Sequence, residues 1–245
     1  MGWKPGKKSR KFFEPAVLAL VLCLAGLLLP AAGGLARVSD AAADAAGPAE
    51  VADGDSAVTA GGAADGRPVV VMLGDSLTAG GVWAPLNPGA RIVNLGVSGD
   101  GCEDVLDRLD AVVVLKPDLV VLQVGVNDLA GSGSPEDIVG GHEAIWRELR
   151  RALPEARLVV CSLLPMGWKW AGGRGPEHYN RRIRQVNRLL QKAAEDEGLP
   201  FLDLYAAMAD LDDNLPDFAT YDGLHLSPKG YAIWYDVVGP RLRRF

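Results

Sequence analysis

Cysteine and histidine are scarce in this sequence, with three of each among 245 residues. A chain of this length with 49% hydrophobic residues buries a sizeable core without disulfide support. The histidines show no metal-ligand spacing, and neither a P-loop nor a G-x-G-x-x-G motif occurs, so we expect no metal, nucleotide or other cofactor. Cys161 lies in an apolar run and is predicted to be a buried thiol, while the sequence leaves open whether it pairs with Cys102.

Positive charge is also scarce once the N-terminus is set aside. Residues 1–36 carry five of the 25 basic residues and one of the 31 acidic residues, which leaves 20 basic and 30 acidic residues in the remainder. The net charge of that remainder is near −10, so its surface repels phosphate backbones and anionic lipid headgroups. We therefore expect no nucleic acid partner.

One long apolar run stands close to the N-terminus, from Ala16 to Ala32, and five basic residues precede it. A basic segment followed by an apolar one is typical of an export signal, so residues 1–36 are predicted to be a signal peptide or a membrane anchor. Cleavage near the small residues at 32–36 would release a periplasmic or extracellular protein. Without cleavage, residues 16–32 would attach the protein to the membrane with its positive end in the cytoplasm.

Aromatic residues are missing from the segment that follows. Residues 37–66 consist almost entirely of Ala, Gly, Asp and Val and show no hydrophobic period. Such a segment has too little apolar surface to offset the entropy of ordering, so it is predicted to be a flexible linker. The folded domain is then expected to span residues 67–245.

Within that domain, short apolar runs alternate with amphipathic segments. Five runs are predicted to be strands, four of them almost unbroken and so buried on both faces: Val69–Leu73, Arg91–Leu95, Leu119–Val124, Arg157–Leu163 and Phe201–Leu204. Helices are predicted over Pro135–Leu153, over Glu177–Glu197 and from Pro228 onward. This alternation predicts an α/β fold, a three-layer α/β/α sandwich around a parallel five-stranded sheet.

Polar and glycine-rich stretches follow the predicted strands. Ser76 lies in "GDS" after the first strand, Gly99 in "NLGVSGDG" after the second and Asn127 in "GVND" after the third, while "YDGLHLSPKGY" with Asp222 and His225 precedes the last helix. Ligands bind at the carboxyl ends of the strands in an open parallel sheet. Together these residues supply what acyl transfer requires: a nucleophile, a base, a group that orients the base, and oxyanion donors.

Each of these residues has a simpler structural explanation when it is taken alone. Ser76 fits a helix N-cap, and Gly99 fits a turn with positive φ. Asn127 fits a turn after a strand, and Asp222 with His225 fits a capping turn. Their joint occurrence at one edge of one sheet favours the enzyme hypothesis.

The four stretches resemble, in order, the four sequence blocks of the SGNH (GDSL) esterase and lipase superfamily. The resemblance extends from Val69 to Tyr231 and is close in "GDSLTAG", "SGDG" and "DGLH". In the third block Val126 stands where the family commonly has Gly or Thr. The resemblance implies a flavodoxin-like SGNH hydrolase fold.

The resemblance also implies the roles of the site residues. Ser76 would be the nucleophile, His225 the base and Asp222 its orienting carboxylate. The oxyanion hole would consist of the backbone N–H groups of Ser76 and Gly99 and the side-chain amide of Asn127. In physical terms, His225 Nε2 would accept the Ser76 proton while Asp222 accepts a hydrogen bond from Nδ1. The G-x-S-x-G elbow is absent, which disfavours an α/β-hydrolase.

The leading hypothesis is therefore a serine carboxylester hydrolase that acts through an acyl-enzyme on short-chain acyl or O-acetyl esters. An acyltransferase with the same residues, in which a sugar or lipid hydroxyl replaces water, remains open. A non-catalytic binding module is disfavoured because the set of site residues is intact. The sequence does not indicate the oligomeric state.

Aromatic residues near the site point to a class of substrate. The segment "PMGWKWAGGRGPEHYN", Pro165 to Asn180, carries Trp168 and Trp170, and Trp83 follows Ser76. These tryptophans either cover the edges of the core or form an aromatic wall beside the substrate. Such a wall suits a small-molecule ester or an acylated carbohydrate.

Overall fold

The computed structural model describes residues 66–170 and 175–244. The predicted signal or anchor segment, and the predicted linker up to residue 65, lie outside the described residues. Among the helices in the described ranges, none is both long enough and apolar enough to span a membrane.

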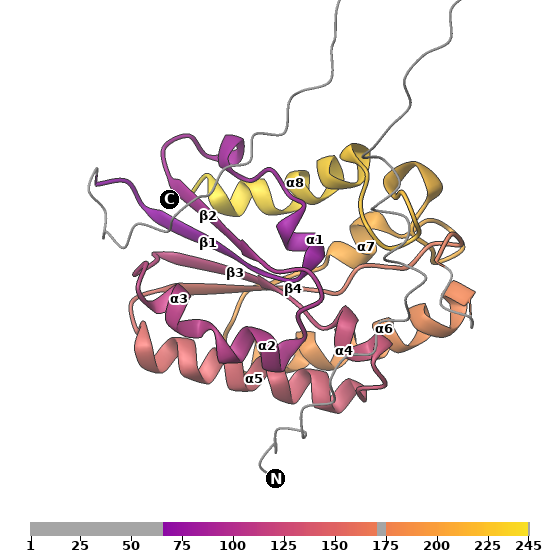
Figure 1. Ribbon diagram of the computed structural model, residues 1–245, viewed down its shortest axis with the longest axis horizontal. Coiled ribbons are helices and arrows are strands. Elements are labelled where there is room, and N and C mark those ends of the chain that lie inside the picture. The colour runs from indigo at the N-terminus through magenta and orange to yellow at the C-terminus, as the bar shows by residue number, and fades with distance from the viewer. Residues whose placement is uncertain (1–65, 171–174, 245) are drawn as a thin grey trace, which may run out of the picture. The chain divides into compact units, whose positions relative to one another are not determined.

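A five-stranded sheet, parallel throughout, forms the centre of the described part of the chain (Figure 1). The strand order is β2-β1-β3-β4-β5. The strands are β1 (Val69–Gly74), β2 (Arg91–Gly96), β3 (Leu119–Gln123), β4 (Arg157–Cys161) and β5 (Phe201–Leu202). β1 lies between β2 and β3, so at the carboxyl edge its end is flanked by the ends of both of these strands.

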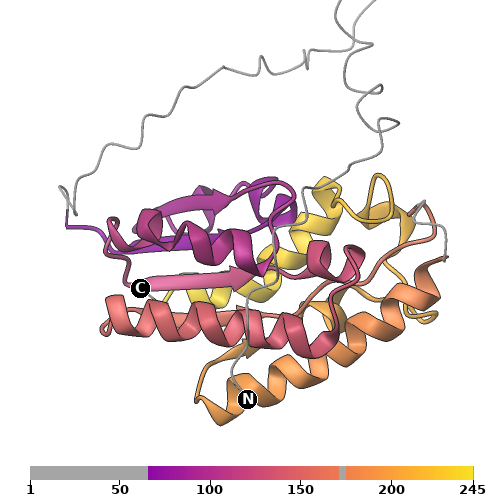
Figure 2. The same ribbon diagram turned by 60° about the horizontal axis from the view of Figure 1, so that its bottom comes forward.

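Helices cover both faces of the sheet, which confirms the predicted three-layer α/β/α sandwich. In Figure 1, α1, α7 and α8 lie on one face, and α2, α3, α5 and α6 lie on the other. Figure 2 shows α5 and α6 side by side. The bounds are α1 (Ser76–Ala79), α2 (Cys102–Asp107), α3 (Leu109–Val113), α4 (Val126–Ala130), α5 (Pro135–Ala152), α6 (Gly175–Asp196), α7 (Leu204–Met208) and α8 (Pro228–Leu242), with 3₁₀ turns η1 (Ala84–Leu86) and η2 (Asp217–Ala219).

Burial follows the position of each strand in the sheet. Every residue of β1 and β3 is buried, as is β4 after its first residue. The edge strand β2 is at most half-buried along its length, and the other edge strand, β5, has only Leu202 buried. Burial is thus confirmed for the three inner strands, whereas the prediction of a fourth buried strand is wrong, because both remaining strands lie at an edge of the sheet and have one side without a neighbouring strand.

Three strands of the structure, β3, β4 and β5, end earlier in the chain than the apolar runs that predicted them. Beyond β4, both backbone groups of Leu163 pair with the side chain of Asn187, at 2.8 and 2.9 Å. Beyond β3, the carbonyl of Val124 is paired with His142 Nε2 at 2.9 Å. Beyond β5, Asp203 caps α7 by accepting from the N–H of Ala206. Side chains satisfy the backbone at these points, so the chain leaves the sheet while Val124, Leu163 and Leu204 stay buried.

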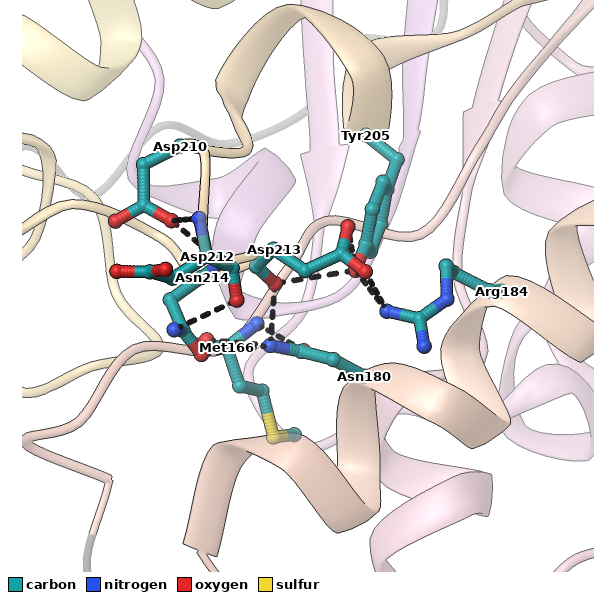
Figure 3. Close-up of polar contacts among 8 residues, drawn as sticks. All are labelled: Met166, Asn180, Arg184, Tyr205, Asp210, Asp212, Asp213 and Asn214. Carbon is teal, nitrogen blue, oxygen red and sulfur yellow. Dashed lines mark hydrogen bonds and ion pairs between the residues drawn. The ribbon is translucent and has the colours of Figure 1, made fainter.

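A polar network fixes the segment that follows β4 (Figure 3). Asn180 Oδ1 accepts from the N–H of Met166 at 2.7 Å, and Nδ2 donates to the Met166 and Asp213 carbonyls at 2.9 and 2.8 Å. The Asp213 carboxylate is bound by Arg184 and the Tyr205 hydroxyl. The buried Asn180 therefore joins α6, the segment after β4 and the loop before η2.

Candidate active site

Ser76 is the first residue of α1, directly after β1. The N-cap is Asp75, whose Oδ1 accepts from the N–H of Leu77 at 2.9 Å. Because Asp75 performs the capping, the Ser76 hydroxyl is not needed to start the helix. Ser76 is half-buried and its side chain is available for a contact from another loop.

His225 contacts both of the residues that the sequence places with it. Its Nε2 lies 3.1 Å from Ser76 Oγ, and its Nδ1 lies 2.7 Å from Asp222 Oδ2. The carboxylate accepts from Nδ1–H, which leaves Nε2 as the acceptor for the Ser76 hydroxyl. The structure thus brings the three residues into one hydrogen-bonded chain, although Ser76 and His225 are 149 positions apart.

The turn that carries Asp222 and His225 is held by its own backbone. Asp222 Oδ1 accepts from the N–H groups of Leu224 and His225 at 2.9 and 2.7 Å. Thr220 Oγ1 accepts from Gly223 N–H and donates to the His225 carbonyl. Burial opposes ionisation of Asp222, but the hydrogen bonds from the His225 ring and from these N–H groups outweigh it and lower the pKa of Asp222. The carboxylate is therefore fixed and ionised.

Asn127 lies in the first turn of α4 and Gly99 in the loop after β2, and these two segments are joined to each other. Asn127 Nδ2 donates to the carbonyl of Asp100 at 2.9 Å, so the start of α4 is bound to the residue after Gly99. A carboxamide has two N–H donors, and this bond occupies one of them. Gly99 has a φ of +85°, a conformation that favours glycine.

Acidic side chains beside the proposed site residues were not predicted from the sequence to have a role. Asp75 is fully buried, and its Oδ2 has no partner among the described residues. Burial raises the pKa of Asp75 to about 7, opposed by the Leu77 hydrogen bond and reinforced by the charge of Asp128. Asp128 accepts from the N–H of Cys102, and burial raises the pKa of Asp128 as well.

Asp128 links two segments of the site to each other. Asp128, next to Asn127, reaches the start of α2, and a Cβ on Gly101 would lie only 2.7 Å from its Oδ1. A glycine is therefore required there by the close approach of the carboxylate. The sequence does contain a sign of these acidic residues: Ser76, Gly99 and Asn127 are each adjacent to an aspartate.

The predicted aromatic wall is only partly supported. Trp83 is 2% exposed, its rings pack against Trp234, Tyr231 and Tyr235, and its Nε1 donates to the Thr78 carbonyl. The prediction that Trp83 lines the substrate site is therefore wrong: its apolar ring is more stable in the core beneath α8 than in solvent.

Trp168 and Trp170 do lie beside the Asp222–His225 turn. Gly167 N–H donates to the Gly223 carbonyl at 2.8 Å, and a Cβ on Gly223 would lie 2.3 Å from Trp170 N. Trp168 is 71% exposed, whereas Trp170 is half-buried against the core. Of the predicted wall, Trp168 has the most side-chain surface available to a substrate.

The two cysteines of the domain are free and buried, so they form no disulfide with each other. Burial raises the pKa of the Cys161 thiol to about 12, which leaves it as an uncharged core residue, as predicted. No group of three or more His, Cys, Asp or Glu side chains that could hold a metal ion occurs within the described part of the chain.

The sequence is similar to known ester hydrolases. The model of the GDSL-like lipase/acylhydrolase family matches residues 54–233. Platelet-activating factor acetylhydrolase IB subunit alpha1 from Homo sapiens is 34% identical over 175 residues, which cover 69% of this chain and 72% of the human protein.

The fold is similar to solved structures of the same family. A GDSL-like lipase from Bacteroides thetaiotaomicron has a TM-score of 0.61 at 24% identity and covers 71% of this chain and 87% of its own. The lipase/acylhydrolase from Enterococcus faecalis has a TM-score of 0.60 at 24% identity, with 72% and 95% covered. Taken with the family match, this chain belongs to the GDSL-like lipase/acylhydrolase family and is a carboxylic ester hydrolase.

Proposed function

We propose that the protein hydrolyses esters through an acyl-enzyme on Ser76. The observation that carries this proposal is the chain from Asp222 through His225 to Ser76, with contacts of 2.7 and 3.1 Å. Ser76 Oγ attacks the ester carbonyl and transfers its proton to His225 Nε2, which then protonates the leaving alkoxide. Water adds to the acyl-enzyme by the reverse proton path and releases the carboxylic acid.

The developing oxyanion requires donors that are already in place. The backbone N–H groups of Ser76 and Gly99, together with the second N–H of the Asn127 amide, are the proposed donors. The bond from Asn127 to the Asp100 carbonyl supports this assignment, because it orients the amide without using both of its protons.

The acyl group is proposed to be short, acetyl above all. The human relative is named an acetylhydrolase, which supports this choice. The exposed Trp168 beside the Asp222–His225 turn offers a flat apolar face for the alcohol part of the ester, such as a sugar ring. We therefore expect a higher kcat/KM for acetyl and butyryl esters than for palmitoyl esters.

Labelling with a fluorophosphonate probe tests the nucleophile, because the probe forms a stable bond only with an activated serine. We expect labelling of the wild-type protein, and none of Ser76→Ala or of protein heated before labelling. Labelling of Ser76→Ala at the wild-type rate would place the nucleophile elsewhere. A series of p-nitrophenyl esters from acetyl to palmitoyl then tests chain length, and the highest kcat/KM on the palmitoyl ester would reject the short-acyl proposal.

We also propose that the protein is exported. The support is the basic segment followed by the apolar run at 16–32, and cell fractionation tests it. The protein is expected in the periplasmic, extracellular or membrane fraction. Full-length protein in the cytoplasmic fraction would reject export.

A further inference from the structure

A separate hollow lies at the edge of the sheet opposite to the proposed active site. It is a cavity of about 370 Å³ whose lining includes Leu119 and Arg157, the first residues of β3 and β4, and Pro200, directly before β5. Ser76 and Asn127 follow the carboxyl ends of β1 and β3. Because the strands are parallel, the hollow is at the amino edge and belongs to a different site.

The charged residues that line this hollow are all arginines. Arg150, Arg157, Arg241 and Arg244 line it, and no Asp or Glu does. This is a local concentration of positive charge in a chain whose net charge is −6. Arg150 binds the carboxylate and the backbone carbonyl of Glu197. The side chains of Arg241 and Arg244 have no ion pair or hydrogen bond with any other described residue.

Helix dipoles explain part of this arrangement. The helices α5, α6 and α8 run back from the carboxyl edge, so their C-terminal ends lie at the amino edge, where basic side chains are favourable. Arg241 lies in the last turn of α8. The dipoles do not account for an open cavity between the arginines, nor for its apolar lining.

The remaining lining residues give the hollow an apolar side. Leu158, Leu199 and Pro200 contribute to it, together with Pro154. Sites for small molecules are commonly hollows of about 300–1,000 Å³ with mostly apolar walls and a few charged groups that orient the ligand. The volume and the lining both fit that description.

We propose that this hollow binds a small organic phosphate, with the phosphate on Arg241 and Arg244 and the organic group on Leu158 and Leu199. A dianionic phosphate offsets two otherwise unpaired guanidinium groups, and planar guanidinium forks bind phosphate oxygens in pairs. Leu158 and Leu199 contribute affinity for the organic group. An organic phosphate is therefore expected to bind more tightly than inorganic phosphate. The same phosphate chemistry is offered by a lipid headgroup, so the experiment includes that source.

Calorimetric titration of the full-length protein with phenyl phosphate tests the site. We expect one binding event per chain, and a loss of affinity of about tenfold or more in Arg241→Gln and in Arg244→Gln. The control is Arg188→Gln, which removes the same charge from the exposed side of α6 and is expected to bind as the wild type does. Inorganic phosphate is expected to bind more weakly than phenyl phosphate.

Several outcomes would overturn the proposal. They are no saturable binding of phenyl phosphate at millimolar concentration, unchanged affinity in both arginine variants, or equal affinity for inorganic phosphate. A dipole role alone would lower the melting temperature of ligand-free Arg241→Gln and leave the affinity for phenyl phosphate unchanged. Arginine-dependent binding to phosphatidic acid vesicles, without binding of phenyl phosphate, would assign the hollow to a lipid headgroup and reject a free ligand.

Discussion

Arg108 donates a hydrogen bond from Nε to Asp100 Oδ2 over 2.7 Å, and its Nη2 donates to the carbonyl of Gly74 over 3.0 Å. Gly74 ends the strand that leads to Ser76, and Asp100 follows Gly99. One guanidinium therefore ties the loop of the proposed nucleophile to the loop of a proposed oxyanion donor. No pattern in the sequence indicated this link.

Replacing Arg108 tests whether that link positions the site. Arg108→Met is expected to lower kcat about ten- to a hundredfold with a smaller change in KM, because a misplacement of about 1 Å between reacting groups is costly. The measurement is steady-state hydrolysis of p-nitrophenyl acetate. Arg151→Met, which removes an exposed pair with Glu148, is the control and is expected to have normal kinetics. An unchanged kcat in Arg108→Met would assign Arg108 to stability alone.

Asp222→Asn tests the orienting carboxylate. An amide at this position retains an acceptor for the backbone N–H groups of the turn but no longer stabilises the His225 imidazolium. We expect kcat to fall by about 10⁴-fold, with circular dichroism and melting temperature close to those of the wild type. Activity within about tenfold of the wild type would mean that His225 does not depend on Asp222.

Asn127→Ala tests the proposed oxyanion donor. Loss of one donor is expected to reduce kcat by roughly 10²–10³-fold. The bond to the Asp100 carbonyl is lost as well. For that reason the melting temperature of Asn127→Ala is measured as well, so that the loss of the Asp100 bond is registered separately from the loss of kcat. A change in KM alone would argue against a role at the oxyanion.

Asp75 is expected to make stability depend on pH. Burial raises its pKa from the ordinary 3.8 to about 7 in the folded state, so folded protein holds a proton that unfolded protein has lost in this window. Stability therefore falls as pH rises from about 4 to about 7.

The comparison with Asp75→Asn isolates this effect, because titrations common to both proteins cancel. Between about pH 5 and about pH 8, the wild-type free energy of unfolding is expected to fall by on the order of 3 kcal/mol more than that of the variant. Urea denaturation of the wild type and of Asp75→Asn at the two pH values measures these free energies of unfolding. If the free energy of unfolding depends on pH in the same way in both proteins, Asp75 does not hold a proton in the folded state.

The two tryptophans Trp83 and Trp168 are expected to respond in opposite ways. Trp168→Ala should lower kcat/KM more for a bulky acetylated sugar than for methyl acetate, with little change in melting temperature, because its ring is exposed. Trp83→Ala should instead cost about 3–5 kcal/mol of stability, as expected for a large buried side chain, with unchanged selectivity. If Trp83→Ala changes the substrate selectivity and Trp168→Ala does not, Trp83 rather than Trp168 contacts the substrate.

Much of the fold follows from patterns that are local in the sequence. The apolar runs at Val69, Leu119 and Arg157 begin within the strands observed there, and Pro135 and Pro228 begin the predicted helices. The spacing of hydrophobic residues along the chain indicates which side chains are buried. That spacing depends only on residues close together in the sequence. The position of Ser76, Asn127 and the Asp222–His225 turn relative to strands and helices follows from the same patterns.

The strand ends show the limit of that information. The apolar runs continue past Gln123 and Cys161, because Val124 and Leu163 stay buried after the strands end. What ends each strand is a partner distant in the sequence or a cap, such as Asn187 on Leu163. The hydrophobicity of a residue indicates whether it is buried, but it does not indicate which group forms the hydrogen bonds of its backbone.

The sequence by itself determined the candidate catalytic residues, since Ser76, Asp222 and His225 stand in short motifs at the ends of predictable elements. Only the tertiary structure decided how they meet, that Asp75 rather than Ser76 caps α1, that Trp83 is a core residue, and that Arg108 joins two loops. The physical reason is that these facts depend on contacts between residues far apart in the chain. Such contacts leave no periodic signal, because the order of strands in the sheet, not their order in the sequence, brings the partners together.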